Sequence, residues 1–309
     1  MSDSKEAAAE DEDDVDDDDD PGTSWFSEHN APEKILRFLT SRHFPLSPRR
    51  RRRHAHPRPV RILDLGTGNG SMLALLRTRG GFPAAGMVGV DYSARSVQLA
   101  RELQRGRLHS AYESGSEEEE EEEEEEDDDG DAVAESIPQE EENQEEEDRQ
   151  EEENHDIRFE EWDILNPESE RALLNHPSAE PIDWFPYDHG GFDIVLDKGT
   201  FDAISLSDDV ITTTTTNAET DRKGGRTVQR RICERYPGIA TMLVRQGGFL
   251  VVTSCNWTEE ELIRWFTLPS LEPETTSSAL EVWGRVEYPR FRFGGQEGQG
   301  VCTVCFRRV

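Results

Sequence analysis

Short apolar runs recur along the chain, and each is followed by glycine or polar residues. Runs of β-branched and aliphatic residues are typical of buried parallel strands, whereas apolar residues at helical spacing indicate amphipathic helices. We expect strands at 60–65, 86–90, 155–162, 192–196 and 249–253. Helices are expected at 32–44, 71–76, 93–108, 228–246 and 258–266. Strands that alternate with helices in this way predict an α/β fold built on a parallel sheet.

The C-terminal region departs from this alternation. Residues 283–293 and 301–308 read as two consecutive strands around Gly294-Gly295, and residues 211–227 read as a polar loop. A late pair of strands after an alternating α/β pattern predicts a Rossmann-like sheet of seven strands, in which the last strand is reversed.

The first strand ends in the sequence D-L-G-T-G-N-G, with glycines at Gly66, Gly68 and Gly70. A strand, a glycine-rich loop and a helix form the first half of a βαβ unit, in which the helix N-terminus directs N–H groups at a ligand. Glycine lets the backbone turn sharply and approach that ligand closely. Asp91, at the end of the second strand, can accept hydrogen bonds from both hydroxyls of a ribose. The pattern therefore predicts a site for a nucleoside-containing cofactor.

Two residues narrow the choice of cofactor. A dinucleotide fingerprint requires its third glycine at the position that Ser71 occupies. Asp64 lies just before the first glycine, where its carboxylate would repel a pyrophosphate but would suit a cationic amino-acid group. The loop resembles motif I of the class I S-adenosylmethionine-dependent methyltransferases. A nicotinamide-binding Rossmann domain is the alternative.

Two further strand ends are expected to contact the cofactor and the acceptor. The third strand ends at Asp163, whose carboxylate can accept the exocyclic amine of an adenine while Ile164 packs on the ring. The fourth strand runs into residues 197–202, which would face the reacting group because ligands bind beyond the C-terminal ends of the strands. The alternative for this stretch is a capped helix start, with an Asp or Thr side chain as the cap.

The formal net charge of −34 is concentrated in two segments. Residues 1–20 carry 12 acidic side chains and one Lys, and residues 113–153 carry 26 and one Arg, which leaves 30 acids and 32 bases elsewhere. Runs of like charge repel and cannot bury apolar surface. We therefore predict a disordered acidic tail at 1–21, a disordered acidic insert at 111–154, and one folded domain made of 22–110 and 155–309.

Other features limit the location and the chemistry. No apolar stretch is long enough to span a bilayer and the N-terminal sequence lacks the features of a signal peptide, so we expect a cytoplasmic protein with reduced cysteines and no membrane contact. Cys302 and Cys305 form a C-x-x-C on a predicted strand, where they would face opposite ways, so no metal site is expected. The basic run 49–53 has three alternative interpretations: a nuclear address, a nucleic-acid contact or a solvated loop. A nuclear address would add a nuclear fraction to the cytoplasmic one.

Several segments together go beyond a general methyltransferase pattern. D-L-G-T-G-N-G, F-D-I-V-L-D-K-G-T-F-D-A, T-S-C-N-W-T-E-E-E-L and F-G-G-Q-E-G-Q-G-V resemble the lysine methyltransferases of translation elongation factor 1-alpha, in particular their fungal branch. The resemblance covers about residues 22–110 and 155–309. An acidic tail replaces much of what the family has before the pair Trp25-Phe26, which either forms a lid or packs against the side of the domain.

The resemblance implies S-adenosylmethionine as the methyl donor and a lysine of elongation factor 1-alpha as the acceptor, with the enzyme expected to act as a monomer. A lysine amine must lose its proton before transfer. A carboxylate can orient the amine and an aromatic wall can desolvate it, and the candidates for these roles are Asp197 and Phe201. The cofactor is expected to contact Asp64, Gly66, Gly68, Gly70, Asp91, Tyr92, Asp163, Ile164 and Asp197.

Two functional alternatives can be weighed against this interpretation. The chain lacks the D/N-P-P-Y loop that orients amide or adenine amines in other methyltransferases, which argues against a nucleic-acid substrate. A non-catalytic acidic protein that binds basic partners through residues 113–153 is the hypothesis from another class. Such a protein would need no intact pocket at Gly66 and Asp91, so cofactor binding measured by calorimetry separates the two.

Overall fold

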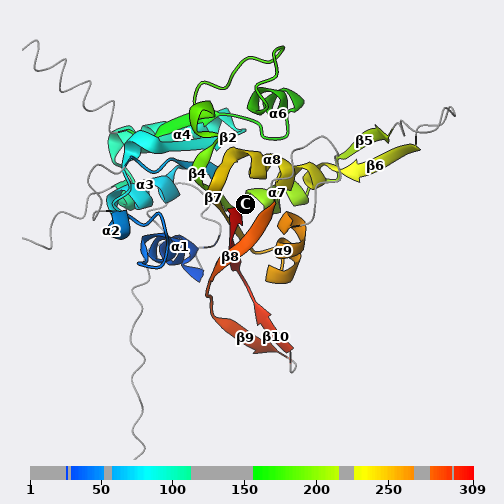
Figure 1. Ribbon diagram of the computed structural model, residues 1–309. Helices are drawn as coiled ribbons and strands as arrows, with labels where there is room; N and C mark the ends of the chain where they lie inside the picture. Colours follow the sequence, from blue (N-terminus) through cyan, green and yellow to red (C-terminus); the bar gives the residue numbers. More distant parts are fainter. Residues whose placement is uncertain are drawn as a thin grey trace, which may run out of the picture.

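A computed structural model of the protein describes residues 26, 29–51, 58–112, 156–215, 226–267, 279–293 and 296–309. Its centre is a seven-stranded sheet in the order β3-β2-β1-β4-β7-β11-β8 (Figure 1). The strands of this sheet are β1 (Ile62–Leu65), β2 (Met87–Asp91), β3 (Arg158–Glu161), β4 (Phe192–Lys198), β7 (Val244–Ser254), β8 (Leu280–Val286) and β11 (Cys302–Arg308). β1, β2, β3, β4 and β7 pair in parallel, whereas β11 is antiparallel to both of its neighbours. The predicted sheet with a reversed last strand is confirmed.

Helices cover both faces of the sheet. Their bounds are α1 (Ala31–Thr40), α2 (Pro48–Arg51), α3 (Ser71–Thr78), α4 (Ala94–Gly106), α6 (Pro167–Leu173), α7 (Thr200–Ser205), α8 (Tyr236–Leu243) and α9 (Glu259–Thr267). The alternation of side chains along β1 assigns the faces, because Ile62 packs into a cluster with α1, α3 and α4, whereas Leu63 packs into a second cluster with α6 to α9. In Figure 1 the blue and cyan helices accordingly lie apart from the yellow and orange ones.

Capping side chains fix the starts of two helices that the sequence predicted, at 93–108 and 258–266. The Ser93 hydroxyl accepts a hydrogen bond from the Ser96 N–H at 3.4 Å and caps α4. Thr258 and Glu261 cap α9 reciprocally, since the Glu261 carboxylate accepts from the Thr258 N–H at 2.9 Å and the Thr258 hydroxyl accepts from the Glu261 N–H at 3.3 Å.

The predicted helix over 228–246 is confirmed only at 236–243, which form α8. Residues before it form β6 (Arg226–Arg231), a 3-10 turn follows at Ile232–Arg235, and α8 begins at Tyr236 with Pro237 in its first turn. Proline fits that position but would break a helix interior, so Pro237 marks a helix start and not its middle. The chain already leaves α8 at Val244 and continues as β7 through Gly247, whose φ is 75°.

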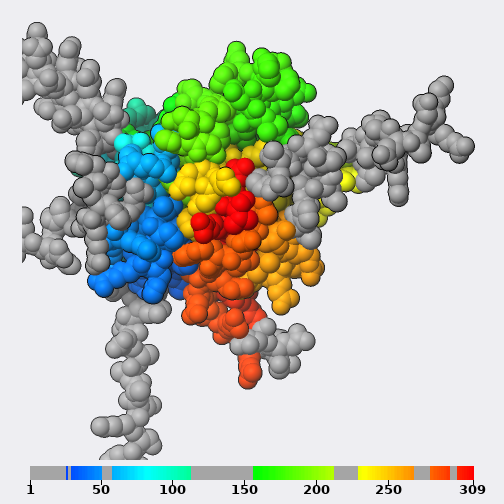
Figure 2. Space-filling view, viewed as in Figure 1, coloured from blue at the N-terminus to red at the C-terminus, as the bar shows by residue number. Residues whose placement is uncertain are grey.

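Two hairpins extend from the domain (Figures 1 and 2). β5 (Val210–Thr215) lies in the region that the sequence predicted to be a loop, and it pairs with β6. The expected single strand over 283–293 is divided, because β8 ends at Val286 and β9 (Arg290–Phe293) pairs with β10 (Gln296–Gln299) instead. β8 pairs with β11 in the main sheet, and this confirms the predicted antiparallel pair at the end of the chain.

The acidic tail and nearly all of the acidic insert lie outside the described residues, as do Trp25 and part of the run 49–53. Ala111 and Tyr112, which the sequence assigned to the insert, are buried against α3, so the packed region extends two residues further than expected. Phe26 packs against Val286, Tyr288 and Val301. None of the helices in the described residues is long and apolar enough to cross a membrane.

Candidate active site

The glycine loop takes a backbone conformation that favours glycine at all three positions. Gly66, Gly68 and Gly70 have φ values of 62°, 58° and 79°, in the left-handed region. A side chain at Gly66 would collide with the Thr200 hydroxyl, and one at Gly70 would approach the Tyr112 hydroxyl to 2.5 Å. A Cβ at Gly68 would meet no atom within 4 Å. The loop is thus packed on two sides and open on the third, at Gly68.

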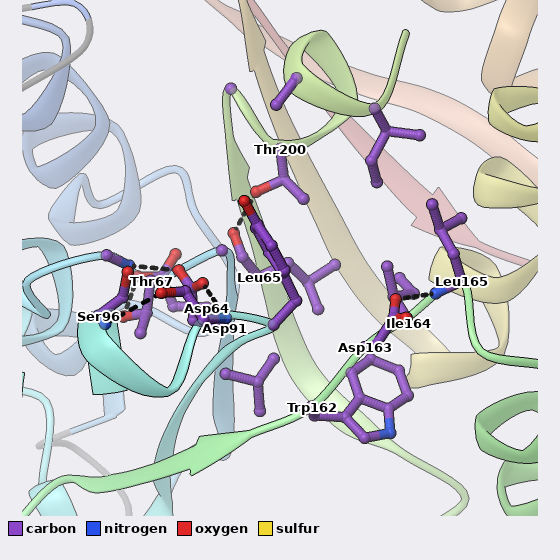
Figure 3. A pocket seen from close by; sticks show the side chains of 18 of the residues that line it. Asp64, Leu65, Thr67, Asp91, Ser96, Trp162, Asp163, Ile164, Leu165 and Thr200 are labelled. Carbon is purple, nitrogen blue, oxygen red and sulfur yellow. Dashed lines mark hydrogen bonds between the residues drawn. The ribbon is translucent and has the colours of Figure 1, made fainter. Parts of the chain in front are cut away.

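That open side faces a cavity of about 950 Å³ at the C-terminal ends of the parallel strands. Figure 3 shows Asp64, Thr67, Asp91 and Ser96 on one side, Trp162 to Leu165 across from them, and Thr200 at one end. Of the nine residues predicted to contact the cofactor, seven line this cavity, namely Asp64, Gly66, Gly68, Asp91, Tyr92, Asp163 and Ile164. The residues selected from the sequence therefore lie together around one cavity, and their contact with the cofactor stays a prediction.

Asp91 ties the second strand to the glycine loop. Its carboxylate accepts hydrogen bonds from the Gly68 N–H at 3.1 Å and from the Ser93 N–H at 2.9 Å. A carboxylate has about four acceptor positions, so these two bonds orient it and leave capacity for two hydroxyl donors. Tyr92 follows directly and is 78% exposed at the rim of the cavity. This side of the cavity has the groups that a ribose requires.

Asp64 supplies a buried negative charge. Its carboxylate is 3% exposed and accepts a hydrogen bond from the Thr67 hydroxyl at 2.8 Å. Burial raises the pKa of Asp64 to about 6, although the Thr67 bond and the charge of Lys198 act in the opposite direction. At neutral pH the group is therefore mainly ionised and can bind a cation.

The opposite wall suits an aromatic base. The Asp163 carboxylate accepts the Leu165 N–H at 2.8 Å, and Ile164 is 8% exposed beside it. Trp162 also lines this wall, and its buried Nε1 atom has no hydrogen-bond partner among the described residues.

These features fit S-adenosylmethionine. The cavity volume lies within the range of cofactor sites, and the open backbone at Gly68 allows close approach. Asp91 offers acceptors for a ribose, Asp163 for an adenine amine and Asp64 for an ammonium group. A pyrophosphate at the glycine loop would meet the carboxylate of Asp64, which disfavours the nicotinamide dinucleotide that the sequence left open.

Gly70, Asp197 and Phe201 do not line the cavity, which corrects their predicted roles. Asp197 is 1% exposed and accepts hydrogen bonds from the Tyr236 hydroxyl at 2.7 Å and the Thr200 N–H at 2.8 Å. It thus caps the start of α7, as the alternative interpretation of this stretch held, and burial raises its pKa to about 7. Phe201 is fully buried between the rings of Tyr236 and Trp257, with centroids at 5.5 and 5.7 Å.

The segment after β4 contributes other residues to the cavity. Lys198 and Thr200 line it as part of the stretch 197–202 that was expected to face the reacting group. Sequence reasoning missed the rest of this end of the cavity, formed by Ala203, Ile204, Asp209 and Ile232. Asp209 meets Ile232 because the Asp209 carbonyl accepts the Ile232 N–H at 2.9 Å across the β5–β6 hairpin. Sequence analysis could not indicate this contact, because it assigned the residues near 232 to a helix.

The C-x-x-C pair does not form a site. Cys302 packs into the cluster with α7 to α9, whereas Cys305 packs into the cluster with α1 and α3, so the two thiols lie on opposite faces of the sheet as predicted. No group of three or more His, Cys, Asp or Glu side chains in the described part of the chain could hold a metal ion.

Comparison with known proteins agrees with this geometry. Residues 58–133 match a family described as a methyltransferase domain. The fold, the cavity and the relatives define the class of the protein: it is an S-adenosylmethionine-dependent methyltransferase.

Two curated relatives match most of the chain. It is 28% identical over 287 residues to Protein-lysine N-methyltransferase EFM4 of Saccharomyces cerevisiae, a match that covers 92% of this chain and 82% of that protein. It is 26% identical over 288 residues to EEF1A lysine methyltransferase 2 of Homo sapiens, a match that covers 93% of this chain and 77% of that protein.

Among solved structures, the N-methyltransferase NodS of Bradyrhizobium japonicum in complex with S-adenosyl-L-homocysteine matches with a TM-score of 0.41 and 14% identity, over 96% of this chain and 93% of that one.

Proposed function

We propose that this protein is a protein-lysine N-methyltransferase and that its substrate is translation elongation factor 1-alpha. The observation that carries the proposal is the similarity to relatives named for this activity over 92 to 93% of the chain. This similarity extends beyond the cofactor loop to the segments after β4 and β7, where a class I methyltransferase receives its acceptor. The proposal includes a monomer that acts in the cytoplasm.

The reaction requires positioning more than acid–base chemistry. S-adenosylmethionine, when bound, supplies a methyl group on a sulfonium centre. Methyl transfer to an amine is an in-line displacement, so the chain contributes by holding the acceptor in line with that centre and by excluding water. The apolar side chains of Ile204 and Ile232 favour a neutral amine over a charged one.

The acceptor lysine enters at the end of the cavity formed after β4. This end is supported by Ile204 and Ile232, which can pack against the aliphatic part of a lysine side chain, and by the exposed carboxylate of Asp209, which can attract its ammonium group. The ribose and adenine groups lie at the other strand ends, so the acceptor and the cofactor need not compete for the same residues.

The test is a methylation assay with purified components. Incubation of the protein with S-adenosylmethionine and elongation factor 1-alpha is expected to add one or more methyl groups to a single lysine, read by mass spectrometry of the digested factor. A matched reaction with S-adenosylhomocysteine in place of the donor is the control. Methylation of other proteins in a lysate but not of the factor would contradict the substrate, and a protein that neither methylates nor binds the cofactor would favour the non-catalytic interaction protein.

A further inference from the structure

Lys198 stands out because the cavity is otherwise acidic. Four carboxylates line it, from Asp64, Asp91, Asp163 and Asp209. Among the described lining residues, Lys198 is the one with a cationic side chain. S-adenosylmethionine carries an ammonium, a sulfonium and a carboxylate. The acidic residues suit its cationic groups, and the carboxylate requires a different partner.

The position of Lys198 matches the amino-acid end of the cofactor. β1 pairs with β4 so that Asp64 lies opposite Leu196, two residues before Lys198. The charge of Lys198 is close enough to Asp64 to oppose the rise in the pKa of that carboxyl. A zwitterionic amino-acid group needs an anion and a cation in the same part of the site, and Asp64 with Lys198 provides both.

Phe26 holds Lys198 from the outside. The Lys198 ammonium lies 5.7 Å from the centroid of the Phe26 ring, within the range of a cation–π contact. Phe26 is 8% exposed and has a φ of 82°, an unusual conformation for a bulky residue that persists only where the surroundings fix it. Its packing against Val286, Tyr288 and Val301 supplies those surroundings.

From these observations we propose that Lys198 binds the α-carboxylate of the cofactor, and that Phe26 positions the Lys198 ammonium for this contact. The proposal deepens the assigned cofactor site and does not depend on the identity of the protein substrate. It gives Phe26 a role in cofactor binding through its contact with Lys198, in addition to its packing against the domain.

The experiment compares two ligands that differ in this carboxylate. S-adenosylhomocysteine carries the amino-acid group, whereas 5′-methylthioadenosine lacks it and keeps the adenosine and the sulfur. Binding of both is measured by calorimetry to the full chain and to Lys198→Met, Lys198→Arg and Phe26→Ala. Lys34→Met is the matched control, because the Lys34 ammonium also lies over an aromatic ring, that of Tyr288 at 5.8 Å, but away from the cavity.

Lys198→Met is expected to weaken S-adenosylhomocysteine about tenfold to a hundredfold and to change 5′-methylthioadenosine less than about twofold, because a charge-assisted bond is lost for one ligand alone. Lys198→Arg is expected to recover most of the loss. Phe26→Ala is expected to produce a smaller loss, again only for S-adenosylhomocysteine, and Lys34→Met none.

Two outcomes overturn the proposal with the cofactor site intact. Unchanged S-adenosylhomocysteine binding by Lys198→Met would show that the carboxylate has another partner. An equal loss for both ligands would show that Lys198 maintains the shape of the cavity instead. Failure of the unaltered protein to bind either ligand would overturn the cofactor assignment itself, and the two kinds of failure are therefore distinguishable.

Discussion

Asp91 and Asp197 are buried carboxylates at the ends of two strands of the same sheet, and they have different surroundings. Each accepts backbone N–H groups of residues that follow its strand, and Asp91 also accepts the Gly68 N–H from the loop after β1. Asp91 keeps one side open to the cavity, whereas the hydroxyl of Tyr236 covers Asp197 from α8. An acidic residue at a strand end therefore indicates a ligand site only where no side chain from another element occupies its remaining acceptors.

The burial of Asp197 also affects its protonation. Asp197 is deeply buried and its pKa is raised to about 7, so the folded protein keeps its proton to a higher pH than the unfolded chain does. Phe201 follows Asp197 by one turn and anchors the same region in an aromatic stack. Asp197 and Phe201 thus support the fold beside the cavity, whereas Asp91 and, from the segment after β4, Lys198 and Thr200 line it.

The largest expected effect tests the supporting role of Phe201. Phe201→Ala removes a fully buried ring and leaves a cavity, so we expect the free energy of unfolding to fall by about 3–5 kcal/mol. Denaturant unfolding measures this change. Phe291→Ala is the matched control, because that ring is 56% exposed on the β9–β10 hairpin and its loss should cost far less.

Cofactor affinity then tests whether Phe201 only supports the fold or also contacts the cofactor. The fraction of Phe201→Ala that remains folded is expected to bind S-adenosylhomocysteine as the unaltered protein does. A stable Phe201→Ala variant with impaired methyl transfer would indicate that Phe201 contacts the acceptor lysine, and that it is not only a structural support.

The second effect depends on pH. A carboxyl whose pKa is raised in the folded state, from 3.8 to about 7 for Asp197, stabilises the fold fully below pH 4, and this contribution is lost as pH rises through 7. Asp197→Asn lacks this dependence. We expect the stability of the variant relative to the unaltered protein to increase by up to about 1.4 kcal/mol per pH unit between pH 5 and 7.

Denaturant unfolding of the ligand-free proteins at a series of pH values makes this measurement. Asp64, whose pKa is also raised, is present in both proteins and cancels in the difference. Parallel pH profiles for the two proteins would mean that Asp197 titrates as an exposed carboxyl does, and that Tyr236 does not cover it.

The third effect tests the open carboxylate. Asp91→Ala removes the acceptor of the ribose hydroxyls and of the Gly68 N–H, so affinity for S-adenosylhomocysteine should fall about tenfold to a hundredfold, or roughly 1.5–3 kcal/mol. Calorimetry measures the affinity, and thermal unfolding confirms that the variant is folded. Unchanged affinity would place the ribose elsewhere in the cavity.

Much of the fold and the cofactor side of the site could be predicted because their signals are local. The glycine loop, the strand that leads into it and the cap at Ser93 each lie within a few residues of sequence. The burial of Phe201 and the hydrogen bond from Tyr236 to Asp197 depend on α8 folding onto β4, a contact between residues 39 positions apart. Periodicity does not report such contacts, and here the helix that makes them was also misplaced, because Pro237 was read inside it and not at its start.

The smallest effect is expected at the acceptor end of the cavity. Asp209 is exposed, so its carboxylate attracts a lysine ammonium only weakly, by at most about 1 kcal/mol. Asp209→Asn should therefore raise KM for the protein substrate up to about fivefold, with kcat and S-adenosylhomocysteine affinity nearly unchanged. Asp208→Asn is the matched control, since Asp208 is an exposed neighbour that does not line the cavity. The difference between the two variants should shrink as ionic strength rises, because exposed charges are screened over about 8 Å at physiological salt. Equal effects of both substitutions would mean that only the general charge of this loop matters, and that the acceptor reaches the cavity by another route.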